Sequence, residues 1–265
     1  MARKRTEKQL SKAIRTAIED DALPAFDEAL GELAARQPLP QAVLDEALLE
    51  AAQSTNTEFA TRLLAAGANV NFAGRMSPLA SAVRVRDSAM VELLLARGAS
   101  PDSRGLMDGT TAIFDAVELG NVAHVKRLLA AGARLDLVDP KTFRCVLHEA
   151  VRKRMSDGKV PPVEILSALL AAGAKPELGD RATRPVLHSA IEVDAVEHTR
   201  VLLEAGANPN TQAVFRGLTA LHVAFEARVH SIVPLLLERG ADRSIADHSG
   251  RDCTSIYDRY GVLLG

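Results

Sequence analysis

The histidines are the residues of this sequence best suited to metal binding or acid–base catalysis, and seven occur in 265 residues. His148, His188 and His222 each lie two residues before an alanine, within a short segment that recurs along the chain. The other four stand singly and are His124, His198, His230 and His248. A zinc site needs several His, Cys or carboxylate ligands at close and regular spacing. Because no histidine has such neighbours in the sequence, we expect no metal site.

The cysteines and serines do not form a nucleophilic motif. Cys145 and Cys253 lie far apart, without the close pairing that metal and redox motifs require. The sequence contains no G-x-S-x-G elbow and no glycine-rich phosphate loop. We therefore predict no catalytic residue, no cofactor and no enzymatic activity, and we interpret both cysteines as small buried residues.

The element that recurs most clearly is a leucine pair followed, after two small or charged residues, by Gly-Ala. Residues 63–68 read Leu-Leu-Ala-Ala-Gly-Ala. After Gly67, the glycine recurs at Gly98, Gly132, Gly173, Gly206 and Gly240, at intervals of 31 to 41 residues. A fixed period in this range is typical of a solenoid of stacked repeats. Such a fold offers partners a long surface rather than an enclosed pocket.

A second recurring segment marks the start of a helix. Residues 219–224 read Thr-Ala-Leu-His-Val-Ala, and equivalent segments begin at Ser77, Thr111, Cys145 and Pro185. A hydroxyl at the first position can cap a helix, and the leucine-rich run predicts a second helix that ends at the glycine. Each repeat should therefore contain two short antiparallel helices. Because Cys145 and Pro185 carry no hydroxyl, we expect their repeats to be the least stable.

These segments resemble the ankyrin repeat family, whose unit of about 33 residues combines T-P-L-H-x-A with a leucine-rich second helix and Gly-Ala. The resemblance covers roughly residues 10–257. It implies an all-α fold, an ankyrin-repeat solenoid of stacked helix-turn-helix units with finger loops. It assigns residues 1–40 to a basic arm and a degenerate N-terminal capping repeat, 41–248 to six ankyrin repeats, and 249–265 to a C-terminal capping helix.

One repeat is longer than the others because extra residues lie near 155–162, where turn-forming residues predict an exposed loop. A tolerated surface insertion explains this loop, since loops lengthen at little cost. The alternative is a contact for a partner, made by a basic spot of Arg152, Lys153, Arg154 and Lys159.

The resemblance also implies where a partner would bind, because ankyrin proteins use the fingers and the first helices as a concave groove. Within it, His148, His188 and His222 would form hydrogen bonds across neighbouring loops. Arg, Met and aromatic residues are enriched at the centres of interfaces. The candidate partner-binding residues are Phe72, Arg75, Met76, Arg104, Met107, Phe143, Arg144, Arg181, Arg184, Phe215 and Arg216. The alternative is that Phe and Met pack under their own loops and that each Arg is merely solvated.

Charge and hydropathy limit the cellular setting. The net charge is −2, yet residues 1–16 carry six Lys or Arg against one Glu, so a basic arm precedes a mildly acidic body. No apolar stretch approaches the ~20 residues that span a bilayer, and the N-terminus lacks the apolar core of a secretory signal. We expect an intracellular protein, cytoplasmic or nuclear, with no membrane contact.

These observations favour a non-enzymatic scaffold that binds a partner protein, with an acidic or extended segment of that partner in the groove. We expect a monomer without a small-molecule substrate or a nucleic-acid partner. One alternative is a nuclear or nucleic-acid-associated regulator led by Arg3, Lys4 and Arg5, although phosphate binding calls for a basic face rather than a short tail. Another is an inhibitor or immunity-type protein whose fingers block an enzyme.

Overall fold

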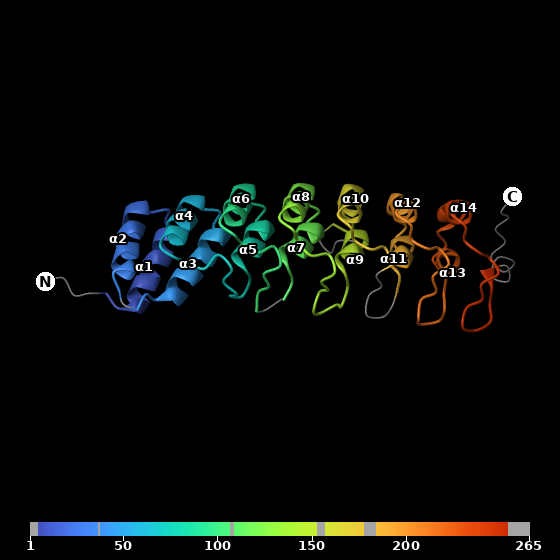
Figure 1. Cartoon of the computed structure of the whole chain (residues 1–265), viewed down its shortest axis with the longest axis horizontal. Coiled ribbons are helices and arrows are strands. Elements are labelled where there is room, and N and C mark those ends of the chain that lie inside the picture. The colour runs from blue at the N-terminus through green and yellow to red at the C-terminus, as the bar shows by residue number, and fades with distance from the viewer. Residues whose placement is uncertain (1–4, 37, 107–108, 153–156, 178–183, 254–265) are drawn as a thin grey trace. The chain divides into compact units, whose positions relative to one another are not determined.

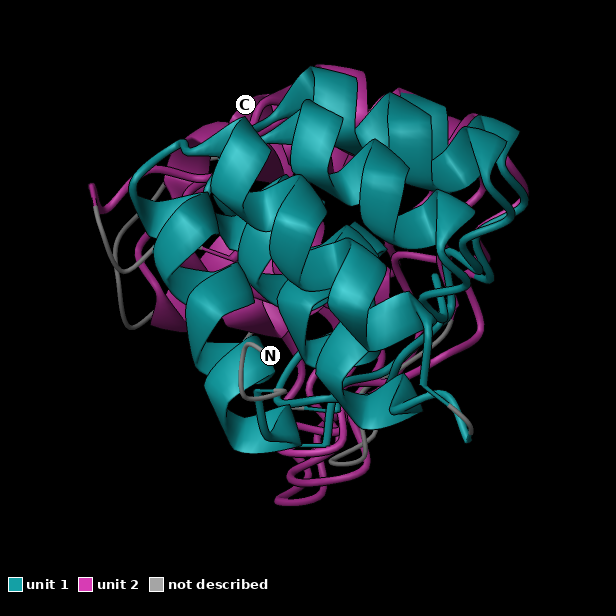
Figure 2. Ribbon diagram, turned by 90° about the vertical axis from the view of Figure 1, so that its left-hand side faces the viewer, with its two compact units in different colours: residues 1–116, 127–134 teal, residues 117–126, 135–265 magenta. Residues whose placement is uncertain are grey.

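The computed structural model describes residues 5–36, 38–106, 109–152, 157–177 and 184–253. The chain forms two compact units, coloured separately in Figure 2. The N-terminal unit contains residues 1–116 and 127–134, and the C-terminal unit contains residues 117–126 and 135–265. The described part is all-helical, and its one β-type contact is an isolated bridge between Val138 and Cys145. Within these ranges, no helix is long and apolar enough to cross a membrane.

The N-terminal unit consists of stacked helix pairs (Figure 1). The pairs are α1 (Glu7–Glu19) with α2 (Leu23–Ala34), α3 (Gln41–Gln53) with α4 (Thr57–Ala65), and α5 (Pro78–Arg84) with α6 (Ser88–Ala96). The first helices contact one another in the order α1, α3, α5, and the second helices in the order α2, α4, α6. Helices α7 (Ala112–Glu118) and α8 (Val122–Ala130) contribute residues to both units.

The C-terminal unit repeats this arrangement with shorter helices. Its helices are α9 (Val146–Val151), α10 (Val163–Ala171), α11 (Val186–Glu192), α12 (Val196–Glu204), α13 (Ala220–Glu226), the 3-10 helix η1 (His230–Ile232) and α14 (Val233–Glu238). Helices α9, α11 and α13 form a row of first helices, and α10 packs on α12 in the second row. A finger loop precedes α9 and another precedes α13 (Figure 1).

Apolar residues at helical spacing build the core between the two rows. In α3, Leu44, Leu48 and Ala51 lie three or four positions apart and are fully buried. Burying each leucine contributes roughly 1.5–3 kcal/mol relative to leaving it exposed. Phe26 of α2 and Phe59 of α4 stack edge to face, with ring centroids 4.5 Å apart, and so join two successive repeats.

The recurring glycine ends each second helix, as its position in the sequence predicts. All six have positive φ, from 83° at Gly240 to 98° at Gly67. At the first copy, Ala68 N–H donates to Leu63 O at 2.9 Å and Gly67 N–H donates to Leu64 O at 3.2 Å. These bonds satisfy carbonyls that the helix end leaves open, and glycine reaches this conformation without a steric cost.

The helix starts differ in part from the sequence prediction. Ser77 Oγ accepts from Ala80 N–H at 3.2 Å, as a cap should, and Cys145 and Pro185 make no side-chain cap. Thr111 Oγ1, however, is buried and has no hydrogen-bond partner. The predicted cap at Thr111 is therefore wrong. In this respect its repeat has no advantage over the repeats that begin at Cys145 and Pro185.

The insertion is fixed at its C-terminal end. His198 Nε2 in α12 lies 2.8 Å from Pro161 O, and both residues are buried. Burial lowers the pKa of His198, against the hydrogen bond to Pro161 and nearby glutamates, which raise it. Lys153, Arg154 and most of the predicted C-terminal capping helix lie outside the described residues, so the basic spot and the domain boundaries stay predictions.

Candidate functional site

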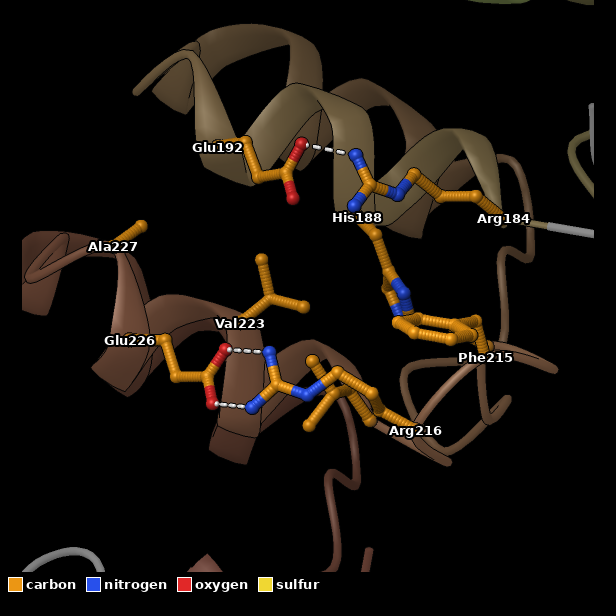
Figure 3. A pocket seen from close by; sticks show the side chains of 10 residues that line it. Arg184, His188, Glu192, Phe215, Arg216, Val223, Glu226 and Ala227 are labelled. Atoms are coloured by element: carbon orange, nitrogen blue, oxygen red, sulfur yellow. Dashed lines mark hydrogen bonds and ion pairs between the residues drawn. The ribbon is translucent and has the colours of Figure 1, made fainter. Parts of the chain in front are cut away.

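In the C-terminal unit, helices α11 and α13 lie side by side and end in glutamates at equivalent repeat positions, Glu192 and Glu226. The apolar faces of both helices are buried, whereas the two terminal carboxylates reach solvent. Each glutamate meets an arginine from the finger before its own helix (Figure 3). The repeat pattern therefore sets two ion pairs along one surface.

The geometry of the two ion pairs differs. Arg184 Nη1 lies 2.6 Å from Glu192 Oε2, whereas Arg216 binds both carboxylate oxygens of Glu226, at 2.5 and 3.0 Å. Burial raises the pKa of Glu192, Arg184 lowers it, and the like charge of Glu226 raises it again. Glu192 and Glu226 thus repel one another.

A cavity of about 570 Å³ lies between these pairs, and we call it the finger cavity. It is lined by Arg184, His188, Glu192, Ala213, Phe215, Arg216, Leu218, Val223, Glu226 and Ala227. One wall of the cavity is formed by Phe215, which is 79% exposed. The cavity therefore combines apolar walls with four balanced charges.

The backbone of the finger presents Phe215 outward. Ala213 N–H donates to Leu218 O at 2.9 Å, and Arg216 and Gly217 have positive φ of 75° and 65°. Gly217 also packs against the imidazole of His248, which leaves no room for a Cβ. A left-handed conformation at an arginine is a form of stored backbone strain.

The three motif histidines have the structural role that the resemblance implies. His148 Nε2 lies 3.0 Å from Arg184 O, and His222 Nε2 lies 3.0 Å from Arg251 O, each in the next finger. His188 is hydrogen-bonded to the backbone of Thr211. Burial is the main cause that lowers the pKa of His188 to about 4, so its imidazole is neutral at pH 7. The prediction of contacts across neighbouring loops is confirmed.

The pair formed by Cys145 and His148 is the arrangement nearest to a nucleophilic dyad, with Sγ and Nδ1 3.2 Å apart. Both residues are about 2% exposed, so a substrate cannot reach them. At the equivalent helix start, Thr219 Oγ1 lies 2.8 Å from His222 Nδ1. The Cys145 thiol therefore takes the place of a structural hydroxyl. Among the residues described, no three His, Cys, Asp or Glu side chains could hold a metal ion together.

Three predicted finger residues of the N-terminal unit contact groups within the same unit. The ring of Phe72 lies over Gly74, Arg104 Nη1 donates to Gly109 O at 2.7 Å, and Met76 Sδ lies 3.5 Å from Arg84 Nη1. Arg75 is exposed. Met107 and Arg181 lie outside the described residues.

In the C-terminal unit the structure brings Arg184, Phe215 and Arg216 together at the finger cavity, and Arg144 lies at a neighbouring hollow. Phe143 lines neither space. The sequence reasoning missed Glu192 and Glu226, which neutralise the arginines expected to attract an acidic partner. Their signal is positional, because each follows the motif alanine, Ala190 or Ala224, by two residues.

Known proteins of related sequence share this repeat. A profile of ankyrin repeats, three copies long, matches residues 48–140 and 147–247. The human B-cell lymphoma 3 protein is 35% identical over 153 residues, which cover 54% of this chain and 32% of that protein. The E3 ubiquitin-protein ligase KEG of Arabidopsis thaliana is 33% identical over 147 residues, which cover 53% and 9%. The chain thus spans about a third or less of these curated relatives.

Two solved structures extend the likeness to the fold. The crystal structure of the ankyrin repeat domain of Bcl-3, a member of the IkappaB protein family, matches with a TM-score of 0.69 and 27% identity. The match covers 79% of this chain and 92% of that one. The ankyrin repeat domain of human ASB11 matches with a TM-score of 0.60 and 26% identity, over 79% and 90%. With its repeats, helix ends and profile in agreement, the chain belongs to the ankyrin repeat family.

Proposed function

We propose that this chain is a non-enzymatic scaffold that binds a partner protein at the finger cavity of its C-terminal unit. Ankyrin repeats in general mediate protein–protein interaction. The observation that carries the proposal is the 79% exposure of Phe215 on a wall of a 570 Å³ cavity. Aromatic side chains and arginines are the residue types enriched at interface centres, and the finger cavity combines them.

An affinity pulldown with quantitative mass spectrometry tests this proposal. The wild-type chain is compared with Phe215→Ala and with Val214→Ala, a neighbouring residue that is 65% exposed but does not line the cavity. We expect Phe215→Ala to deplete a specific partner at least tenfold and Val214→Ala to retain it. Equal recovery with both variants would move the binding surface away from the finger cavity.

The nucleic-acid alternative depends on the basic arm, and one of its charges is already engaged. Arg5 Nη2 lies 3.0 Å from Glu28 Oε1, and Arg5 Nη1 lies 3.6 Å from Glu32 Oε1. An arginine paired in this way contributes less to phosphate binding. For this reason we favour a protein partner over a nucleic acid. We place this binding inside the cell. An inhibitor that blocks an enzyme would be one form of the same protein-binding activity.

A further inference from the structure

Arg144 is the finger arginine whose expected acidic partner is missing from the sequence. Arg184 and Arg144 occupy equivalent positions, each immediately before the first residue of its helix-start segment. Arg184 pairs with Glu192 at the end of its own first helix. The position equivalent to Glu192 in the preceding repeat is Arg152. The position that supplies a carboxylate to Arg184 therefore holds a like charge in the repeat of Arg144.

No neighbouring carboxylate among the described residues replaces the missing partner of Arg144. Arg152 pairs with Glu149 of α9, with Nη2 2.9 Å from Oε2. Within the described part of the chain, the Arg144 guanidinium makes no hydrogen bond or ion pair. Arg144 is only half-buried, so it can present its charge to a ligand.

Arg144 borders a hollow of about 120 Å³, which we call the arginine hollow. Its lining also includes His148, Arg152, Arg184, Ser189, Glu192 and Val193. Two of the three arginines are neutralised by Glu149 and Glu192, so the hollow carries one unbalanced positive charge. The hollow shares Arg184 and Glu192 with the finger cavity, and the two spaces are therefore neighbours.

We propose that the two spaces together bind an extended protein segment in which a single Asp or Glu lies one or two positions from a large apolar side chain. The carboxylate binds Arg144 in the arginine hollow, where a guanidinium can donate two parallel hydrogen bonds. The apolar side chain enters the finger cavity against Phe215, Leu218 and Val223. Neighbouring residues of an extended chain lie about 3.3–3.6 Å apart along the backbone, which suits two adjoining spaces. The inference rests on the proposed function and specifies its partner.

The charge balance favours one carboxylate over a polyanion. Glu192 lines both spaces and Glu226 lines the finger cavity. A nucleic acid would bring successive phosphates along these carboxylates and would be repelled, whereas a single acidic residue needs one unbalanced cation, which Arg144 supplies.

Selection from a phage-displayed library of random twelve-residue peptides tests the proposal on the full chain. We expect enriched peptides to carry Asp or Glu within two positions of Phe, Leu, Ile or Met. The best peptide is then synthesised with a fluorescein label and titrated by fluorescence polarisation. Arg144→Glu should raise its Kd at least tenfold, Arg144→Lys by a smaller factor, and Arg97→Glu, at an exposed arginine of the N-terminal unit, should leave it unchanged.

A second form of the peptide separates a direct contact from a general charge effect. Replacing its acidic residue by the matching amide should weaken binding to wild type as strongly as Arg144→Glu does, and should add little to that variant. Circular dichroism checks that each variant is folded, and Arg144→Ala replaces Arg144→Glu if the reversal unfolds the chain.

The possible outcomes test the acidic-segment proposal separately from the proposed protein-binding function. Peptides enriched without an acidic residue, or an acidic peptide insensitive to Arg144, would overturn the inference and leave protein binding intact. Absence of any enriched peptide that Phe215→Ala weakens would overturn both. A fluorescent duplex DNA that binds wild type and is lost in Arg144→Glu would assign Arg144 to phosphate instead.

Discussion

Two finger residues of the N-terminal unit contact their own loops, whereas three finger residues of the C-terminal unit border a cavity. Phe72 covers Gly74 and Arg104 bonds to Gly109 O, but Phe215 is 79% exposed and Arg184 reaches the end of its own first helix. Distance from the helix-start motif does not account for the difference, because Phe72 lies five residues before Ser77 and Phe215 lies four residues before Thr219. Residue type alone therefore does not identify a contact residue.

The largest predicted difference in stability is between replacing a buried phenylalanine in the N-terminal unit and replacing an exposed one in the C-terminal unit. Phe59→Ala removes a fully buried ring that stacks on Phe26, and we expect it to cost about 3–5 kcal/mol of stability. Phe215→Ala should change stability by less than about 0.5 kcal/mol. Hydrogen exchange with mass spectrometry, which reads each unit separately, measures both. Comparable losses would mean that Phe215 belongs to the core.

Lowering the pH should reduce the folding stability of the C-terminal unit by more than its surface charges alone would predict. His188 stays neutral in the folded chain down to its pKa of about 4, but it takes up a proton below 6.5 in the unfolded chain. Folded protein thus binds fewer protons in this window, and stability falls as pH drops from 6.5 to 4, by up to about 3 kcal/mol. The lowered pKa of His198 acts in the same direction.

Chemical denaturation at several pH values measures this loss, with hydrogen exchange assigning it to residues 135–253. Arg184 and His222 face His188 and oppose its protonation. His188→Gln removes the titrating group and should flatten the profile between pH 6.5 and 4. A profile that is equally steep in this variant would contradict the assignment to His188.

Breaking one ion pair in each unit should change stability by an intermediate amount. Arg84 binds Asp115, whose side chain is 4% exposed, whereas Arg216 binds Glu226, whose side chain is 32% exposed. Arg84→Ala removes charged hydrogen bonds from a buried carboxylate and should cost about 1–3 kcal/mol. Arg216→Ala should cost no more than about 1 kcal/mol. Urea unfolding of both variants checks the order, and a larger loss at Arg216 would make that wall of the finger cavity part of the fold.

The sequence predicts the repeat well because its signals are local. The glycine that ends each second helix and the histidine that bonds to the next finger are fixed by backbone geometry within one unit. The ion pairs at Glu192 and Glu226 depend on how a finger folds over its helix, which periodicity does not describe. The absent cap at Thr111 likewise depends on side-chain rotation. Helix positions could therefore be predicted, but not which charges remain available to a partner.

The smallest effect concerns the turns between paired helices, where five residues other than glycine have left-handed φ. They are Asp21, Thr55, Arg86, Asp194 and Arg228, with φ between 52° and 62°. Thr55, in the N-terminal unit, is β-branched and crowds its own backbone in this conformation, whereas Asp194, in the C-terminal unit, tolerates it. Thr55→Gly should therefore raise stability by about 1 kcal/mol, and Asp194→Gly by no more than a few tenths.

Thermal unfolding, together with hydrogen exchange near each turn, tests this pair of glycine substitutions. Both replacements add the same backbone freedom to the unfolded chain, so the difference between them reports the strain released in the folded state. Equal effects at the two sites would show that side-chain branching does not matter there. A loss of stability at Thr55 would mean that its side chain makes a contact worth more than the strain of its left-handed backbone.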